Sequence, residues 1–137
     1  MKRSLLLVVL LFACRETDPI AGAVDKVVDA AEDRDASAVM EQVSSTYEGR
    51  ADIEQTLRQY FFAYRAIEVS ITDLQTRSDE KEGWASFRVN FTGVPKEIGG
   101  IAEMVPRAAK YQFQVWLVQE GGEWKIADAR WEQVPAP

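Results

Sequence analysis

The hydrophobic period of this chain changes once, close to residue 65, and that change restricts the fold more than any other feature. Before it, apolar residues recur every three to four positions, as along one face of a helix. After it, apolar and polar residues alternate, as in a strand that is buried on one side. Helices followed by a run of antiparallel strands predict an α+β domain, with the helices packed on one face of the sheet.

The helical part divides into three predicted segments. Asp18 followed by Pro19 is typical of an N-cap and a first helical residue, so the first helix begins there. An acidic break at 33–35 ends it, and Asp35 can cap a short second helix. A loop at 44–49 follows, and Asp52 starts or caps the third helix. The apolar face of that helix carries Ile53, Leu57, Tyr60, Phe61 and Tyr64.

Four strands are predicted after the change of period, at 67–72, 86–91, 111–117 and from 124 onward. The charged segment 78–83 predicts one hairpin turn, and Gly121-Gly122 predicts a tight second one. Beyond Ile126 the apolar phase shifts by one residue, which indicates a β-bulge. The aromatic side chains expected to face inward are Phe87, Phe91, Phe113 and Trp124.

The start of the chain has the pattern of a lipoprotein signal. Lys2 and Arg3 precede an apolar run at 5–12, and Ala13 precedes Cys14. The run is too short to span a bilayer, which takes about 20 residues. This order resembles the lipobox of bacterial lipoproteins, in which the Cys is acylated and the signal is cut just before it. An uncleaved membrane anchor and an ordinary secretory signal are the alternatives.

The lipobox resemblance implies how the chain is divided and where in the cell it is located. Residues 1–13 would be the signal peptide, 14–18 the lipidated Cys14 with a short tether, and 19–137 the domain. The partner it implies is a membrane in the bacterial envelope, reached through the lipid. Arg15 follows the Cys where enteric inner-membrane lipoproteins carry Asp, so we expect the outer membrane, facing the periplasm, in a Gram-negative cell.

Composition excludes several classes of function. The net charge is −6, and it falls to near −8 once Lys2 and Arg3 are removed. An acidic domain without a basic run is poorly suited to nucleic acid, whose phosphates supply most of the affinity. The chain has no His, so it lacks the commonest general base and metal ligand, and its single Cys excludes an internal disulfide. We therefore expect no metal, no cofactor and no nucleic-acid partner.

Three stretches together resemble the nuclear transport factor 2-like superfamily, which includes SnoaL-like and ketosteroid isomerase-like proteins. They are the helix, acidic break and short helix at 28–43, the loop at 48–53, and the final hairpin at 122–131. The resemblance covers residues 18 to 134. It implies a cone, with a cavity between the helices and a curved antiparallel sheet. The connection between the second and third helices is short, so we expect the small hairpin that many members carry there to be reduced or absent.

The resemblance also suggests where a site would lie. Isomerase-like members use an Asp base and Tyr or Asp donors in an apolar pocket. The nearest equivalents here, Tyr60, Tyr64 and Asp128, are weak candidates, and no catalytic residue is assigned. Alternatively, the tyrosines belong to a core stripe, and the bulge turns Asp128 to solvent or towards an Arg. The expected ligand pocket comprises Tyr60, Tyr64, Phe91, Met104, Phe113 and Asp128.

Two further segments have open interpretations. The stretch 94–109, with Gly99-Gly100 before Ile101 and Met104, is either an apolar lid with a glycine hinge or a packed connection. Trp116 and Val118 are predicted to face away from the helices. They would form either a homodimer surface on the convex face of the sheet or a partly exposed patch.

These observations favour a non-catalytic envelope lipoprotein that binds a small apolar or amphipathic ligand, or a protein partner. The alternative is an isomerase, dehydratase or hydrolase with an Asp/Tyr site. A purely structural envelope subunit is the third possibility.

Overall fold

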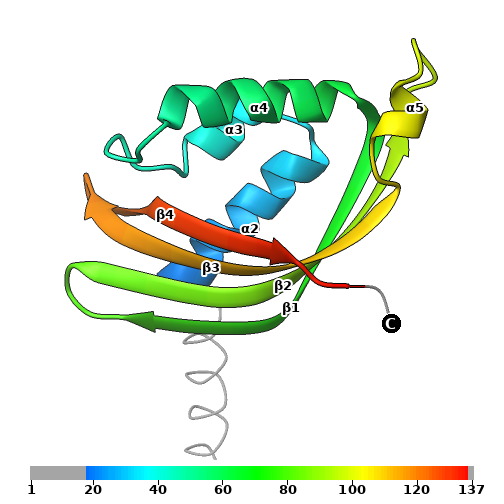
Figure 1. The fold of residues 1–137 in the computed structure, drawn as a ribbon. Coiled ribbons are helices and arrows are strands. Elements are labelled where there is room, and N and C mark those ends of the chain that lie inside the picture. Colours follow the sequence, from blue (N-terminus) through cyan, green and yellow to red (C-terminus); the bar gives the residue numbers. More distant parts are fainter. Residues whose placement is uncertain (1–17, 136–137) are drawn as a thin grey trace, which may run out of the picture.

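The computed structural model describes residues 18–135. Four antiparallel strands form one curved sheet in the order β1-β2-β3-β4, and the helices lie on its concave side (Figure 1). The helices are α2 (Pro19–Glu32), α3 (Ala36–Met40), α4 (Arg50–Phe62) and the short α5 (Ile101–Met104). The strands are β1 (Tyr64–Ser78), β2 (Glu82–Pro95), β3 (Ala108–Glu120) and β4 (Glu123–Gln133). The predicted α+β class is confirmed.

Helix starts follow the predicted caps in two cases out of three. The Asp18 carboxylate accepts hydrogen bonds from the Ile20 and Ala21 N–H groups, and Asp35 caps α3 in the same way. The other oxygen of Asp18 accepts a 2.8 Å bond from the Thr76 hydroxyl, which ties the start of α2 to the far end of β1. The helix α4 begins two residues before the expected Asp52, because Gly49 at φ +77° turns the chain into it.

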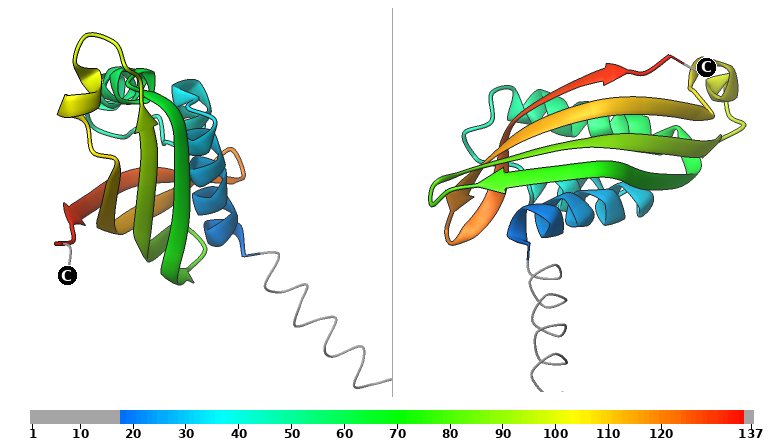
Figure 2. Two further views of the ribbon diagram at one scale, coloured as in Figure 1. Left: turned by 90° about the vertical axis from the view of Figure 1, so that its right-hand side faces the viewer. Right: turned by 90° about the horizontal axis from the view of Figure 1, so that it is seen from below.

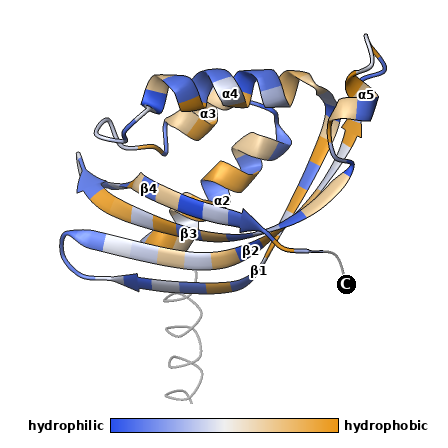
Figure 3. Cartoon of the chain, viewed as in Figure 1, coloured by the Kyte–Doolittle hydropathy of each residue, from blue (hydrophilic) through white to orange (hydrophobic). Residues whose placement is uncertain are grey.

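The core has two parts, one beneath each long helix. Under the first half of α2, Ile20 and Val24 pack with Phe87 and Trp124. Under the end of α4, Phe61 is buried against β1 and β2. Figure 3 shows that α4 is hydrophilic over most of its length, so only its last turns contribute to the core. Phe87, Phe91 and Trp124 are buried as predicted, whereas Phe113 is only partly buried.

Two shifts of register in the strands change the face of the sheet to which the following side chains point. The register of β3 with β4 shifts between Trp116 and Leu117, which confirms the bulge predicted after Ile126. A second shift in β1, around Asp73 at φ +56°, was not expected from the sequence. Bulges of this kind bend a strand and increase the local twist of a sheet.

The connection from β2 to β3 is a packed segment with an exposed tip. Ile101 and Val105 pack on the core beside α4, while Met104 is 82% exposed. Met104 was expected in the ligand pocket, and that expectation is wrong because its position on α5 points it into solvent. Gly99 and Gly100 both have positive φ, which a residue with a Cβ adopts at a cost.

Cys14 and the predicted signal lie outside the described residues. Within residues 18–135, none of the helices has both the length and the apolar character needed to cross a bilayer.

Candidate functional site

A row of three aromatic rings crosses the concave face of the sheet. Phe87, Phe113 and Trp131 are register partners on β2, β3 and β4. The first two ring centroids are 5.5 Å apart and the second two 5.9 Å, with planes inclined by only 4° and 22°. Phe87 is buried, Phe113 is half-buried and Trp131 is 58% exposed. The row therefore runs from the core to an uncovered indole.

Beside this row, tyrosines from three elements come together. Tyr60 on α4 and Tyr64 at the start of β1 have ring centroids 5.2 Å apart, and both rings contact Phe91. Tyr111 meets Phe113 edge-on at 6.2 Å, which joins the tyrosines to the aromatic row. The Tyr64 hydroxyl donates a 2.6 Å hydrogen bond to the Pro106 carbonyl. Tyr64 is fully buried, whereas Tyr60 and Tyr111 are half-buried.

Burial raises the pKa of each of these three hydroxyls above its usual value. They consequently stay protonated throughout the physiological range and act as hydrogen-bond donors. The Tyr64 proton is committed to Pro106, so Tyr60 and Tyr111 are the hydroxyls left to meet a polar group on a ligand.

Four of the six residues expected in the pocket are brought together here. Tyr60, Tyr64 and Phe91 are in contact, whereas Phe113 is the register partner of Phe87, four residues along β2 from Phe91, and joins the group through Tyr111. Met104 and Asp128 do not join them.

Asp128 is opposite Trp116 in the register, on the other face of the sheet, and its carboxylate is exposed. The bulge causes this placement, since it shifts the side-chain phase of β4 by one residue. Its carboxylate accepts a 2.9 Å bond from the Ala129 N–H. Tyr111 and Trp131 belong to the site although the pocket expectation omitted them. Their strand phase, shared with Phe113, was the signal available.

Several solved structures have the same fold as this chain. No known protein family and no curated protein sequence matches the chain. A candidate scytalone dehydratase from Novosphingobium aromaticivorans superposes with a TM-score of 0.73 at 12% identity, covering 90% of this chain and 87% of that one. A candidate dehydratase of the NTF2-like family from Streptomyces avermitilis gives 0.71 at 12%, covering 88% and 97%. The fold is that of the NTF2-like proteins.

A third similar structure is the Bdellovibrio bacteriovorus protein Bd1075, with a TM-score of 0.69 at 10% identity. The match covers 84% of this chain but only 40% of that protein. At such identities the likeness establishes an NTF2-like fold, and fold alone does not determine function.

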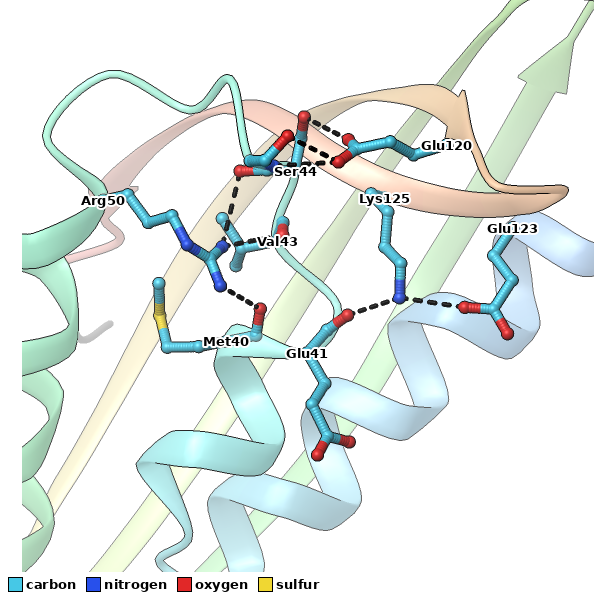
Figure 4. A network of polar contacts seen from close by, with 9 residues as sticks. Met40, Glu41, Val43, Ser44, Arg50, Glu120, Glu123 and Lys125 are labelled. Atoms are coloured by element: carbon cyan, nitrogen blue, oxygen red, sulfur yellow. Dashed lines mark hydrogen bonds and ion pairs between the residues drawn. The ribbon is translucent and has the colours of Figure 1, made fainter.

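The loop after α3 covers the first half of β4, the edge strand of the sheet. Val43 forms a parallel bridge with Ile126, through Ser44 N–H to Ile126 O at 2.7 Å and Ile126 N–H to Gln42 O at 2.8 Å. Arg50 donates to the carbonyls of Met40 and Val43, which holds the loop in shape (Figure 4). No hairpin lies in the described segment between α3 and α4, in agreement with the short connection.

Glu120 fastens this loop to the β3–β4 hairpin. Its carboxylate accepts bonds from the Ser44 hydroxyl at 2.6 Å and the Ser45 hydroxyl at 2.7 Å, together with the Ser45 N–H (Figure 4). These donors hold the pKa of Glu120 below its usual value of 4.5. Ser44 is itself fully buried, and its hydroxyl is satisfied by Glu120 together with Thr46.

Acid is expected to loosen the loop. Because the folded-state pKa of Glu120 is depressed, its stabilising effect is complete above pH 4.5 and disappears as the pH falls through the lower folded value. Amide protection of Ser45 and Thr46, measured by NMR hydrogen exchange, should fall over that acid range. Glu120→Gln should lower protection already at neutral pH. Glu48→Gln, an exposed change in the same loop, is the control, and equal behaviour of the two variants would contradict this role.

On the convex face, Trp84 and Trp116 lie side by side in register. Arg77 covers the first ring at 4.3 Å, and Arg130 covers the second at 5.3 Å. A shallow groove of about 430 Å³ lies over the two tryptophans and continues to Val118. Trp116 and Val118 thus share the face that was expected to pair with a partner, and both are half-buried.

Within residues 18–135 no group of three or more Cys, Asp or Glu side chains is arranged to hold a metal ion.

Proposed function

We propose that this chain is a lipid-anchored envelope protein whose NTF2-like domain binds a small apolar or amphipathic ligand without transforming it. The observation that carries the proposal is the aromatic row that ends at Trp131. An exposed indole stacked on a half-buried phenylalanine offers a flat apolar surface at little entropic cost. A planar ring of a ligand would lie against this aromatic surface.

The tyrosines define the polar end of such a ligand. Tyr60 and Tyr111 lie beside the row and are protonated at neutral pH, so they favour a hydrogen-bond acceptor such as a carbonyl or ether oxygen. The ligand class that fits is a planar or amphipathic molecule with one polar oxygen next to an apolar body.

The enzymatic alternative requires a base close to the tyrosines. The isomerase-like chemistry pairs a carboxylate with Tyr donors, and Asp128 lies on the opposite face of the sheet from Tyr60 and Tyr64. This separation is why we favour binding over an isomerase, dehydratase or hydrolase reaction.

The proposal is tested with the neutral probe N-phenyl-1-naphthylamine, whose fluorescence rises in an apolar site. Trp131→Ala should weaken probe binding by at least about tenfold, because it removes the exposed end of the stack. Trp131→Phe should retain most of it.

Leu74→Ala removes an apolar side chain of 38% exposure from the β1 bulge and serves as the control. Unchanged binding in Trp131→Ala would refute the site. If Asp128→Asn removed the biological activity while probe binding and folding were kept, the enzymatic alternative would be preferred.

A further inference from the structure

The second half of β4 has an open hydrogen-bonding edge. β4 is the outermost strand of the sheet (Figure 2). Val134 donates inward to the Lys110 carbonyl at 2.8 Å. Because antiparallel ladders alternate, Glu132 and Arg130 also point their backbone groups at β3, and Trp131 and Gln133 point theirs outward.

The first half of β4 is covered. Residues 42–44 bridge to Ile126, and the outward Ala129 N–H donates to the Asp128 carboxylate at 2.9 Å. Past that point, none of the described segments pairs with the outer edge of Trp131 or Gln133. An edge strand that is covered for half its length and open for the rest is a place where another strand can add.

We propose that the strand added here is the same β4 edge of a second copy of this chain. The two strands run antiparallel about a twofold axis at Trp131. A twofold contact of this kind uses the same surface on both copies, so the edge must complement itself.

Charge selects this register among those that the backbone allows. A residue whose backbone N–H and C=O groups point outward must pair with another such residue on the partner. The axis can therefore pass through Arg130, Trp131 or Glu132. An axis at Arg130 would set two guanidinium groups against each other, and an axis at Glu132 would set two carboxylates together. An axis at Trp131 places Arg130 opposite the partner's Glu132, and does so twice.

The side chains on both faces of the edge fit this arrangement. Arg130 and Glu132 are exposed, and neither forms an ion pair within residues 18–135. The Arg130 guanidinium is already held on the convex face by Trp116 at 5.3 Å. On the concave face, the 58% exposed Trp131 would meet the partner's Trp131.

This pairing rests on the β4 edge alone and does not require the proposed ligand. It nevertheless completes the proposed site, since the two aromatic rows would join across the axis. Each ligand surface would then include an indole from the other copy.

Charge reversal tests the pairing without altering the concave face. The full chain in mild detergent should sediment as a dimer at about 10 µM. Arg130→Glu and Glu132→Arg each turn two attractive pairs into two repulsive ones, and each should weaken the dimer by at least about tenfold. The double variant, R130E with E132R, restores opposite charges and should restore the dimer.

Arg88→Glu is the matched control, because Arg88 is an exposed arginine on the convex face but in the central strand β2. Circular dichroism of every variant should show an unchanged fold, since the altered side chains are exposed. A monomeric wild-type chain would overturn the proposal. A dimer indifferent to the single reversals would overturn it too, and would place pairing on another surface such as the Trp84–Trp116 groove. A double variant that stays monomeric would overturn the register.

Discussion

Tyr64→Ala is expected to lower the free energy of unfolding by about 3–5 kcal/mol, a large share of the stability of a domain of this size. Tyr64 is fully buried where α4 passes directly into β1, and its ring contacts Tyr60 and Phe91. Removal leaves a cavity that none of these neighbours can close alone. Tyr64→Phe removes the hydroxyl that bonds to Pro106 and makes a long contact with the Tyr60 hydroxyl, so it should cost about 1 kcal/mol. Urea unfolding monitored by circular dichroism measures both.

A glycine opposite this ring provides a sharper version of the same test. A Cβ on Gly93 would come within 2.5 Å of Cε1 and 2.6 Å of Cδ1 of Tyr64. Gly93→Ala should therefore cost about 1–3 kcal/mol through overpacking, and the penalty should shrink in the Tyr64→Ala background. Gly22→Ala, in α2 with no atom near the new Cβ, should instead raise stability by about 0.5–1 kcal/mol. Additive costs at positions 64 and 93 would mean that the ring does not occupy this place.

Cys14→Ser is expected to abolish labelling by a fatty-acid analogue and to move the protein from the membrane fraction to the soluble fraction. A single acyl chain anchors a protein only marginally, whereas two or more hold it stably, at about 0.8 kcal/mol for each buried methylene. The loss of every acyl chain should therefore abolish membrane association completely.

Ala13→Gly keeps a small residue before the cleavage point and should preserve both labelling and membrane association. Labelling that survives in Cys14→Ser would contradict the lipoprotein interpretation and the cellular location that it implies. This outcome would leave the binding site and the β4 edge untouched, since both lie within residues 18–135.

Much of the fold could be predicted because local signals and tertiary packing agree. Asp18 and Asp35 cap their helices with their own side chains, and Gly121 and Gly122 both adopt the positive φ of a tight hairpin. The bulge in β4 could be predicted because the apolar residues of that strand change from one alternating phase to the other. The bulge at Asp73 was not, since the surrounding residues are mostly polar and exposed and impose no phase.

The site was harder to predict than the fold, because it depends on how far each side chain lies from the sheet edge. Phe113 and Trp131 share a strand phase with buried residues, yet their exposure increases towards the outer strand. The alternation of apolar and polar residues shows which face of the sheet a side chain lies on. It does not show whether a helix covers that face. Asp128 shows the converse, since a one-residue bulge moved it to the other face, as the alternative interpretation of the sequence allowed.

The bond between Asp18 and Thr76 sets the height at which an anchored domain would work. It fixes the start of α2 near the β1–β2 hairpin. Tyr64 lies at the opposite end of β1, up to about 40 Å along the strand, and the aromatic row lies between them, level with the Asp73 bulge. Three residues lie between Cys14 and Asp18, so the four Cα–Cα steps reach about 14 Å at full extension. For a protein anchored at Cys14, the hairpin end would stand close to the lipid surface. A domain upright on that end would open its binding face towards the aqueous compartment, where it would meet its ligand in water.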